Sequence, residues 1–234
     1  MADWVASGRG LRWLACLNPH SCAVSFRDPE FGRALRGADW VVPDGVGILL
    51  ASRILGGSIR ERVTGSDIFL HLSRRLNRVG GKSVFFLGAT ESTLEEIRRR
   101  MAREFPNLRV AGTYSPGFTP EFTDAEVRAM VHAVNAARPD VLWVGMTAPK
   151  QEKWIFRHGS RLNVKVACAI GAVFDFYTEK VPRSHPAFQR FGLEWLPRLL
   201  RQPGRLWRRT FVSAPAFLWR VVRSRVAGPT GHRS

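Results

Sequence analysis

The sequence predicts an α/β protein with a doubly wound, mainly parallel sheet, helices on both faces, and a basic amphipathic helical appendage at the C-terminus. Short apolar runs alternate along the chain with segments in which apolar residues recur every three or four positions. Several of these segments begin with a capping residue or end on glycine. The 234 residues, 45% of them hydrophobic, are enough to bury a full core.

The apolar runs predict strands, and the periodic segments between them predict helices. The strands are expected at 11–17, 38–42, 83–87, 107–113, 141–144 and 164–170. The helices are expected at 20–36 with a break near Pro29, at 45–55, 65–79, 92–105 and 123–137, and within 145–158. The clearest boundary signals are the glycine pair at 56–57, Thr64 with Asp67, and Ser92 with Glu95.

The stretch 41–67 carries the first candidate site. Asp44 stands between Pro43 and Gly45, where the second apolar run stops. A rigid proline and a permissive glycine hold this carboxylate at a strand end, where open α/β sheets bind ligands, so Asp44 is a candidate general base. The alternative is a simple turn residue, because Pro-Asp-Gly is also a common turn sequence. Arg62, shortly before the next helix start, is a candidate cation of the same site.

Polar residues follow most of the predicted strands. They are Asn18 after the first strand, Asp44 after the second, 88–90 after the third, 147–153 after the fifth and Asp175 after the sixth. Because the carboxyl ends of parallel strands meet at one edge of the sheet, we expect a single ligand site there. Pro149 opens a helix whose free amides, with Lys150 and Gln151, suit a phosphate. The alternatives are solvated charges at an exposed helix start, and a capping role for Asp175.

The net charge of +17 is unevenly distributed. From residue 183 to the end the chain has eleven arginines, no lysine and one glutamate, a net of +10. We therefore expect an α/β domain at 1–182 and a basic appendage at 183–234. Such an appendage indicates an anionic partner, either phospholipid or nucleic acid.

Cysteine content, apolar runs and short motifs exclude several classes of protein. Three cysteines without a CxxC pair argue against a disulfide framework or a zinc site and favour a reducing compartment. No apolar run reaches the roughly 20 residues of a membrane span, so we expect a cytoplasmic protein that is at most peripheral to a membrane. The dinucleotide, P-loop, HExxH and GxSxG patterns are incomplete or absent, and no Asp-x-Asp pair occurs, so no cofactor or metal is expected.

Six motifs recur in order over about residues 11–210: PDGVGILLASRILGG, ERVTGSD, VFFLGA, VGMTAPKQEKWI, GAVFDFYTEKVPR and FGLEWLPRLLRQPGRLWRR. Together they resemble the WecG/TagA/CpsF glycosyltransferase family. The resemblance implies transfer from a UDP-sugar to an undecaprenyl-diphosphate-linked sugar at the cytoplasmic membrane face, with inversion and without a metal. It implies an N-acetylmannosaminyl, N-acetylmannosaminuronyl or glucosyl group. LNPHS and ASRILGG also resemble the exopolysaccharide glucosyltransferase branch.

The resemblance also implies roles for individual residues. Asp44 would be the general base and Arg62 a charge-stabilising catalytic residue. On the donor side, Gln151 would contact the donor, Asp175 the uracil, and Phe118 would pack on the base; Gly88 and Lys150 complete the predicted donor set. On the acceptor side, Asn18 matches the family's asparagine in the first loop, and Cys16 replaces the threonine that usually precedes it by two positions.

The predicted appendage combines apolar and cationic residues. Apolar residues recur every three or four positions over 188–199, and arginines take much of the remaining surface. Such a helix suits an anionic lipid interface, and its guanidinium groups suit a diphosphate. The predicted acceptor contacts are Arg198, Arg201, Arg205 and Arg208. The alternative is a helix packed on the core with a solvated basic face.

Two other functions are weighed against the transferase. A nucleic-acid-binding protein would agree with a pI of about 11.4, but the smaller charge of the first 182 residues and the leucines and tryptophans of the tail disfavour it. A nucleotide-sugar-binding protein without transfer activity would have the same donor residues but would not need Asp44. We expect the transferase, peripheral on the inner membrane and without a nucleic-acid partner, and leave open whether it forms a homo-oligomer.

Overall fold

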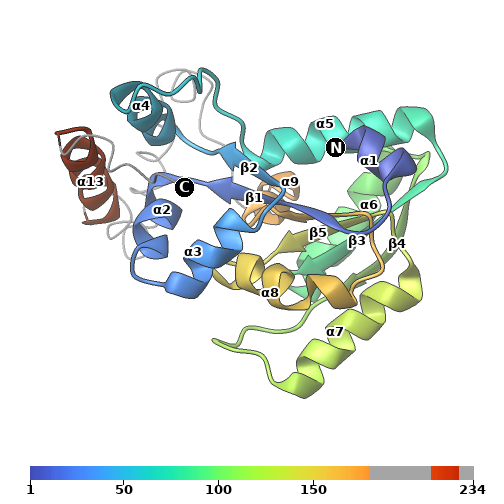
Figure 1. Cartoon of the computed structure of the whole chain (residues 1–234). Helices are drawn as coiled ribbons and strands as arrows, with labels where there is room; N and C mark the ends of the chain where they lie inside the picture. Colours follow the sequence, from blue (N-terminus) through green and yellow to red (C-terminus); the bar gives the residue numbers. More distant parts are fainter. Residues whose placement is uncertain (180–211, 227–234) are drawn as a thin grey trace. The chain divides into compact units, whose positions relative to one another are not determined.

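A computed structural model describes residues 1–179 and 212–226 (Figure 1). The chain forms a parallel six-stranded sheet in the order β2-β1-β6-β5-β3-β4, and helices surround it. The strands are β1 (Arg12–Leu17), β2 (Trp40–Pro43), β3 (Lys82–Gly88), β4 (Leu108–Tyr114), β5 (Val141–Gly145) and β6 (Val166–Ala169). The predicted α/β class is confirmed, and each strand overlaps the apolar run that predicted it. The appendage arginines at 198, 201, 205 and 208 lie outside the described residues.

The helices also follow the predicted pattern, with some differences. They are α1 (Ala2–Ser7), α2 (Pro19–Ser25), α3 (Pro29–Arg36), α4 (Val46–Ile54), α5 (Gly65–Val79), α6 (Glu91–Glu104), α7 (Asp124–Ala137), α8 (Lys150–His158), the short 3-10 helix η1 (Gly159–Arg161), α9 (Val173–Tyr177) and α13 (Ala214–Val226). The sequence pattern did not predict α1, η1 or α9. The start of α6 was predicted at Ser92, but the helix begins at Glu91 because the Thr90 hydroxyl accepts from the Thr93 amide and caps it.

The chain groups into two compact units. The first contains residues 1–16, 33–41 and the described residues from 65 to 179. The second contains 17–32, 42–64 and the described residues 212–226. The predicted boundary between 182 and 183 rests on charge alone and stays a prediction.

In the first unit, helices cover both faces of the sheet (Figure 1). Helices α5, α6 and α9 lie on one face, where the rings of Phe69 and Trp143 have centroids 5.1 Å apart and those of Phe86 and Phe174 5.5 Å apart. Helices α7 and α8 lie on the other face. Because side chains alternate along a strand, the neighbouring Phe85 points to the α7 side. Strand β5 is buried on both faces, as a central parallel strand requires.

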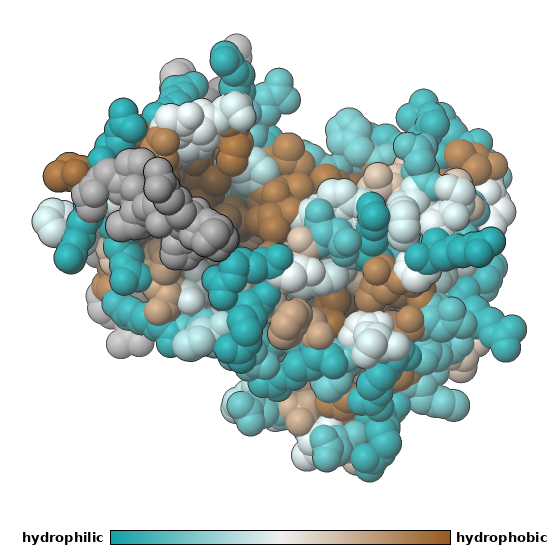
Figure 2. Space-filling view, in the orientation of Figure 1, coloured by the Kyte–Doolittle hydropathy of each residue, from teal (hydrophilic) through white to brown (hydrophobic). Residues whose placement is uncertain are grey.

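Helix α7 shows how a surface helix of this unit is specified. Thr123 and Glu126 form a reciprocal capping box at its start. Its apolar side chains, including Met130 and Val134, are buried, whereas hydrophilic residues make up most of its visible surface (Figure 2). The helix therefore forms where an amphipathic pattern follows a strong N-terminal cap.

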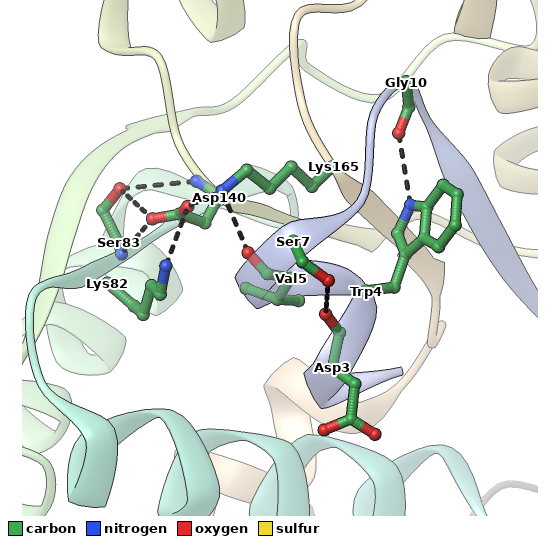
Figure 3. A network of polar contacts seen from close by, with 9 residues as sticks. All are labelled: Asp3, Trp4, Val5, Ser7, Gly10, Lys82, Ser83, Asp140 and Lys165. Atoms are coloured by element: carbon green, nitrogen blue, oxygen red, sulfur yellow. Dashed lines mark hydrogen bonds and ion pairs between the residues drawn. The ribbon is translucent and has the colours of Figure 1, made fainter.

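A polar network ties the N-terminal helix to the amino edge of the sheet (Figure 3). The Asp140 carboxylate accepts from the Ser83 amide at 3.0 Å and pairs with the Lys165 ammonium at 3.1 Å. Lys165 also donates to the Val5 carbonyl at 2.9 Å, so α1 is joined to the start of β3 and to the residues that precede β5 and β6. These hydrogen bonds and ion pairs stabilise the amino edge of the sheet, where the strands begin. The opposite edge, where the strands end, is left for ligands.

The strand order creates a switch point between β3 and β5. The chain leaves β3 through α6 toward β4 on one side, and leaves β5 through α8 toward β6 on the other side. Loops that depart in opposite directions open a crevice at the carboxyl ends of the two strands, where ligands of open α/β sheets bind.

The second unit has its own apolar cluster. Phe217 and Val221 of α13 are 4% and 6% exposed and pack with Ile48 and Ala51 of α4. Cys22 and Ala23 of α2 join the same cluster. Helix α13 is thus held to α2 and α4 by burial of apolar surface.

Candidate active site

Two glycines line the switch point in the first unit. Gly88 and Gly145 are the last residues of β3 and β5 and stand opposite each other in the strand register. Gly88 has φ +115°, and a Cβ there would lie 2.6 Å from the Gly145 carbonyl oxygen. The next residue, Ala89, also has a positive φ of +59°. The two backbones therefore approach without side chains between them, as a site that receives a phosphate or sugar closely would require.

Gln151 joins the loops that follow β5 and β6. Its side chain is 3% exposed, and Oε1 accepts from the Met146 amide at 3.2 Å and the Gly171 amide at 3.0 Å. Gly171 has φ +57°, and a Cβ there would lie 3.6 Å from Gln151 Nε2. The structure places the predicted donor residue at the carboxyl edge, where its carboxamide oxygen holds the backbone of the site.

Glu152 is the functional candidate that sequence reasoning missed. It is 1% exposed, and its Oε1 accepts from Gln151 Nε2 at 2.9 Å. Burial raises the pKa of Glu152 to about 7, with the Gln151 hydrogen bond acting in the opposite direction. The sequence signal was the Lys-Gln-Glu-Lys run, for which solvated charge was the alternative to a phosphate site, whereas the chain turns this glutamate inward.

Lys150 points to the loop between β4 and α7 that carries Phe118. Its ammonium donates to the Thr119 carbonyl and lies 3.6 Å from the centroid of the Phe122 ring. Burial lowers the pKa of Lys150. Phe118 itself is 87% exposed. Lys150 thus anchors this loop, and the aromatic ring predicted to pack on a base is accessible to solvent.

Asp175 lies in the first turn of α9, directly after the loop that leaves β6. The residue at the N-cap is Ala172, and no side chain caps this helix. Asp175 lies three positions past the cap and is therefore not the N-cap residue of α9. Cys16, predicted on the acceptor side, ends the part of β1 in this unit, and its Sγ lies 3.4 Å from where a Cβ of Gly65 would stand.

The second unit brings together the segments that carry Asp44 and Arg62. The Asp44 amide donates to the Leu17 carbonyl at 2.8 Å, and the Val63 amide donates to the Pro43 carbonyl at 3.0 Å. The half-buried Asp44 is therefore held in a loop between the exit of β1 and the residue that follows Arg62. These segments are distant in sequence, and the two backbone hydrogen bonds hold them next to one another.

Two close contacts shape this loop from the α2 side. Asn18 caps α2, since its Oδ1 accepts from the Ser21 amide at 2.9 Å. A Cβ on Gly47 would lie 2.5 Å from Pro19 Cγ, so only glycine lets α4 approach this closely. The predicted acceptor residue Asn18 therefore holds the backbone directly after Leu17. The Leu17 carbonyl in turn accepts from the Asp44 amide.

Two absences concern residues 1–179 and 212–226, the part of the chain that the structure describes. No three His, Cys, Asp or Glu side chains of these ranges gather as a metal site would need. Within the same ranges, no helix has the length and apolar character to cross a bilayer.

An open parallel sheet with glycines at its switch point and polar residues at its strand exits is an arrangement in which α/β enzymes bind nucleotides. A model of the WecG/TagA/CpsF glycosyltransferase family matches residues 1–230, and the chain belongs to this family. It is a glycosyltransferase.

The chain is also similar to individual members. One relative is the N-acetylglucosaminyldiphosphoundecaprenol N-acetyl-beta-D-mannosaminyltransferase of Bacillus spizizenii. It is 31% identical to this chain, over 94% of this chain and 82% of its own length. A protein of the same name from Bacillus subtilis is 27% identical over 90% of this chain and 78% of its own length. Another protein of this name, from Staphylococcus aureus, is 24% identical over 91% of this chain and 80% of its own length. These matches favour neither of the two alternative functions.

Proposed function

We propose that this glycosyltransferase moves a sugar from a UDP-sugar to a polyprenyl-diphosphate-linked sugar in the synthesis of a cell-envelope polysaccharide, inverting the anomeric centre without a metal. The observation that carries the proposal is the placement of Asp44, in a loop held by backbone hydrogen bonds beyond β1 and beside Val63. Inversion by direct displacement needs one base within reach of the acceptor hydroxyl, and a single carboxylate fills that role.

The donor would bind at the switch point of the first unit. The N-terminus of α8 and the bare backbone at Gly88 and Gly145 suit the diphosphate, and the exposed Phe118 ring suits the base. Asp175 follows β6 at the same edge of the sheet and is assigned to the uracil. Arg62 would stabilise the negative charge that develops on the leaving UDP.

N-acetylmannosamine is the first candidate for the transferred sugar, because the relatives named above are N-acetylmannosaminyltransferases. Their names also contain the acceptor, an N-acetylglucosaminyl diphosphoundecaprenol. Glucosyl transfer in exopolysaccharide synthesis is the second candidate, on the motifs LNPHS and ASRILGG.

We further propose that the enzyme works on the anionic cytoplasmic face of the membrane, where a polyprenyl acceptor is anchored. Helix α13 supports this, because Trp219, Val222 and Val226 are exposed at helical spacing among arginines. Apolar and cationic residues on one exposed helix suit a lipid interface.

The transfer reaction is tested with purified protein, a panel of UDP-sugars and a short-chain polyprenyl-diphosphate N-acetylglucosamine, by UDP release and product mass. We expect transfer from UDP-N-acetylmannosamine, unchanged by EDTA. Asp44→Asn should lower kcat by roughly 10²- to 10⁴-fold, because it removes the base, and leave UDP binding intact. Asp124→Asn, at the exposed start of α7, is the matched control and should retain activity.

Three outcomes would contradict the proposal. No transfer with any donor, together with tight and salt-sensitive binding of DNA or RNA, would favour the nucleic-acid alternative. UDP-sugar binding without transfer would leave a binding protein. Full activity in Asp44→Asn would remove Asp44 from the mechanism.

A further inference from the structure

A buried polar pair begins helix α8. Gln151 and Glu152 are adjacent in sequence, and they are 3% and 1% exposed. Buried amide and carboxyl groups are destabilising unless hydrogen bonds replace their lost hydration. The partners of these two side chains therefore indicate why the chain keeps them inside.

The Gln151 carboxamide acts through its oxygen. Oε1 accepts from the Met146 amide of the loop after β5 and from the Gly171 amide of the loop after β6. One atom thus holds two loops at the carboxyl edge, next to the Gly145 end of the switch point. Both lone pairs of this oxygen are occupied.

The orientation of that carboxamide depends on Glu152. Gln151 Nε2 donates to Glu152 Oε1 at 2.9 Å. Turned by half a rotation, the carboxamide would point its NH₂ group at two N–H donors and would lose both loop contacts. An acceptor on the Nε2 side therefore selects the orientation in which Oε1 faces Met146 and Gly171.

The hydrogen bond with Gln151 accounts for only one of the two carboxyl oxygens of Glu152. Among the described residues, Glu152 Oε2 has no hydrogen-bond partner, although the side chain is almost fully buried. A leucine of similar volume would avoid that cost but would supply no acceptor. The cost is consistent with a functional requirement at this position.

We propose that Glu152 is a positioning residue of the donor site, which orients the Gln151 carboxamide so that it holds the two loops that receive the nucleotide sugar. This assignment rests on the proposed function for the location of the donor. The action on the loops themselves is independent of which ligand binds there.

Variants at position 152 test the role in the reaction. Glu152→Leu keeps the volume and removes the acceptor, and Glu152→Ala is made in parallel in case the leucine variant does not fold. Both should raise the KM for the UDP-sugar and the Kd for UDP about tenfold or more, with a smaller change in kcat. Glu152→Gln retains an acceptor oxygen and should stay within about twofold of the parent.

Asp140→Asn is the matched control, because it weakens a polar network at the opposite edge of the sheet. It should lower Tm without changing KM. A Glu152→Leu or Glu152→Ala protein with lower Tm but unchanged KM and UDP affinity would show a purely structural role. Glu152→Gln as impaired as the leucine variant would exclude orientation by an acceptor.

Amide hydrogen exchange tests the loops without any substrate. Peptides that contain the Met146 and Gly171 amides should exchange about tenfold faster in Glu152→Ala than in the parent, and at the parent rate in Glu152→Gln. Unchanged exchange in the alanine variant would overturn the proposal. Faster exchange in a protein that does not bind UDP would instead support the positioning role and contradict the proposed donor.

Discussion

At the scale of single residues, the carboxyl edge depends on where side chains are missing. A Cβ on Gly145 would lie 2.3 Å from the Phe174 ring, and Phe174 is 2% exposed and packs against Phe86. A buried ring between packed neighbours has no room to turn away. Glycine at the end of β5 therefore lets α9 pack against the strand and leaves the backbone bare at the switch point.

Gly145→Ala is expected to destabilise the protein by about 1–3 kcal/mol through overpacking against Phe174. Chemical denaturation followed by circular dichroism measures this change. Gly145 is not among the glycines with a positive φ, so backbone strain of that kind does not add to the loss. An unchanged stability in Gly145→Ala would mean that contact with Phe174 is unimportant.

Glu152 should make stability depend on pH. Its pKa of about 7 in the folded protein lies above the usual value near 4.5, so the folded state binds the proton more tightly than the unfolded state. Burial of this carboxyl therefore does not change the free energy of unfolding below about pH 4.5. It lowers that free energy progressively as the pH rises from about 4.5 to about 7, and the loss is complete above about pH 7.

Glu152→Gln removes this titration. Relative to the parent, the variant should gain stability between pH 5 and pH 8 by up to roughly 3 kcal/mol, because burial raises the pKa of Glu152 from its ordinary value to about 7. Urea denaturation of both proteins at the two pH values gives the difference, and other titrating groups cancel. A difference that is constant with pH would show that Glu152 does not titrate in this range.

At the scale of elements, α13 has two apolar sides with different exposure. Phe217 and Val221, four residues apart, are buried against α2 and α4, whereas Trp219 is 68% and Val226 82% exposed. The guanidinium of Arg220 lies 4.2 Å from the centroid of the ring of Phe26, the C-cap residue of α2. One side thus stabilises the second unit, and the other is available to a lipid surface.

Substitutions on the two sides should separate these effects. Phe217→Ala should lose about 3 kcal/mol of stability, because it removes a buried aromatic ring. Trp219→Ala should leave Tm nearly unchanged and weaken binding to anionic liposomes about tenfold at physiological salt. Thermal denaturation and liposome sedimentation distinguish them. Equal sedimentation of Trp219→Ala and the parent would exclude this face as the lipid contact.

At the scale of the whole molecule, the C-terminal part is expected to matter for folding as well as for binding. Removing residues 183–234 deletes α13 and exposes Ile48 and Ala51, which are now 7% and 6% exposed. The truncated protein should have a lower Tm and bind a hydrophobic dye, whereas an appendage without a structural role would leave both unchanged. Calorimetry and dye fluorescence, compared with the full chain, check this expectation.

The sequence by itself determined the class of the fold and the positions of its elements. Apolar runs and capping signals report local preferences, and these agree with the packed sheet from β1 to β6. It also indicated the family, because the motifs at the strand exits are short and contiguous. Helix α1 escaped prediction because it is short and is held by Lys165, far away in the chain.

Only the tertiary structure decided which of the predicted residues meet. The crossovers of the sheet place Gly88 opposite Gly145, and hydrogen bonds between distant segments hold the Asp44 loop between Leu17 and Val63. The burial of Gln151 and Glu152 likewise involves contacts that the charged run around them does not indicate, since Gln151 accepts from the loops after β5 and β6 and donates to Glu152. Periodicity reports which face of an element is buried, whereas the partner across that face depends on contacts between segments that are far apart in the chain.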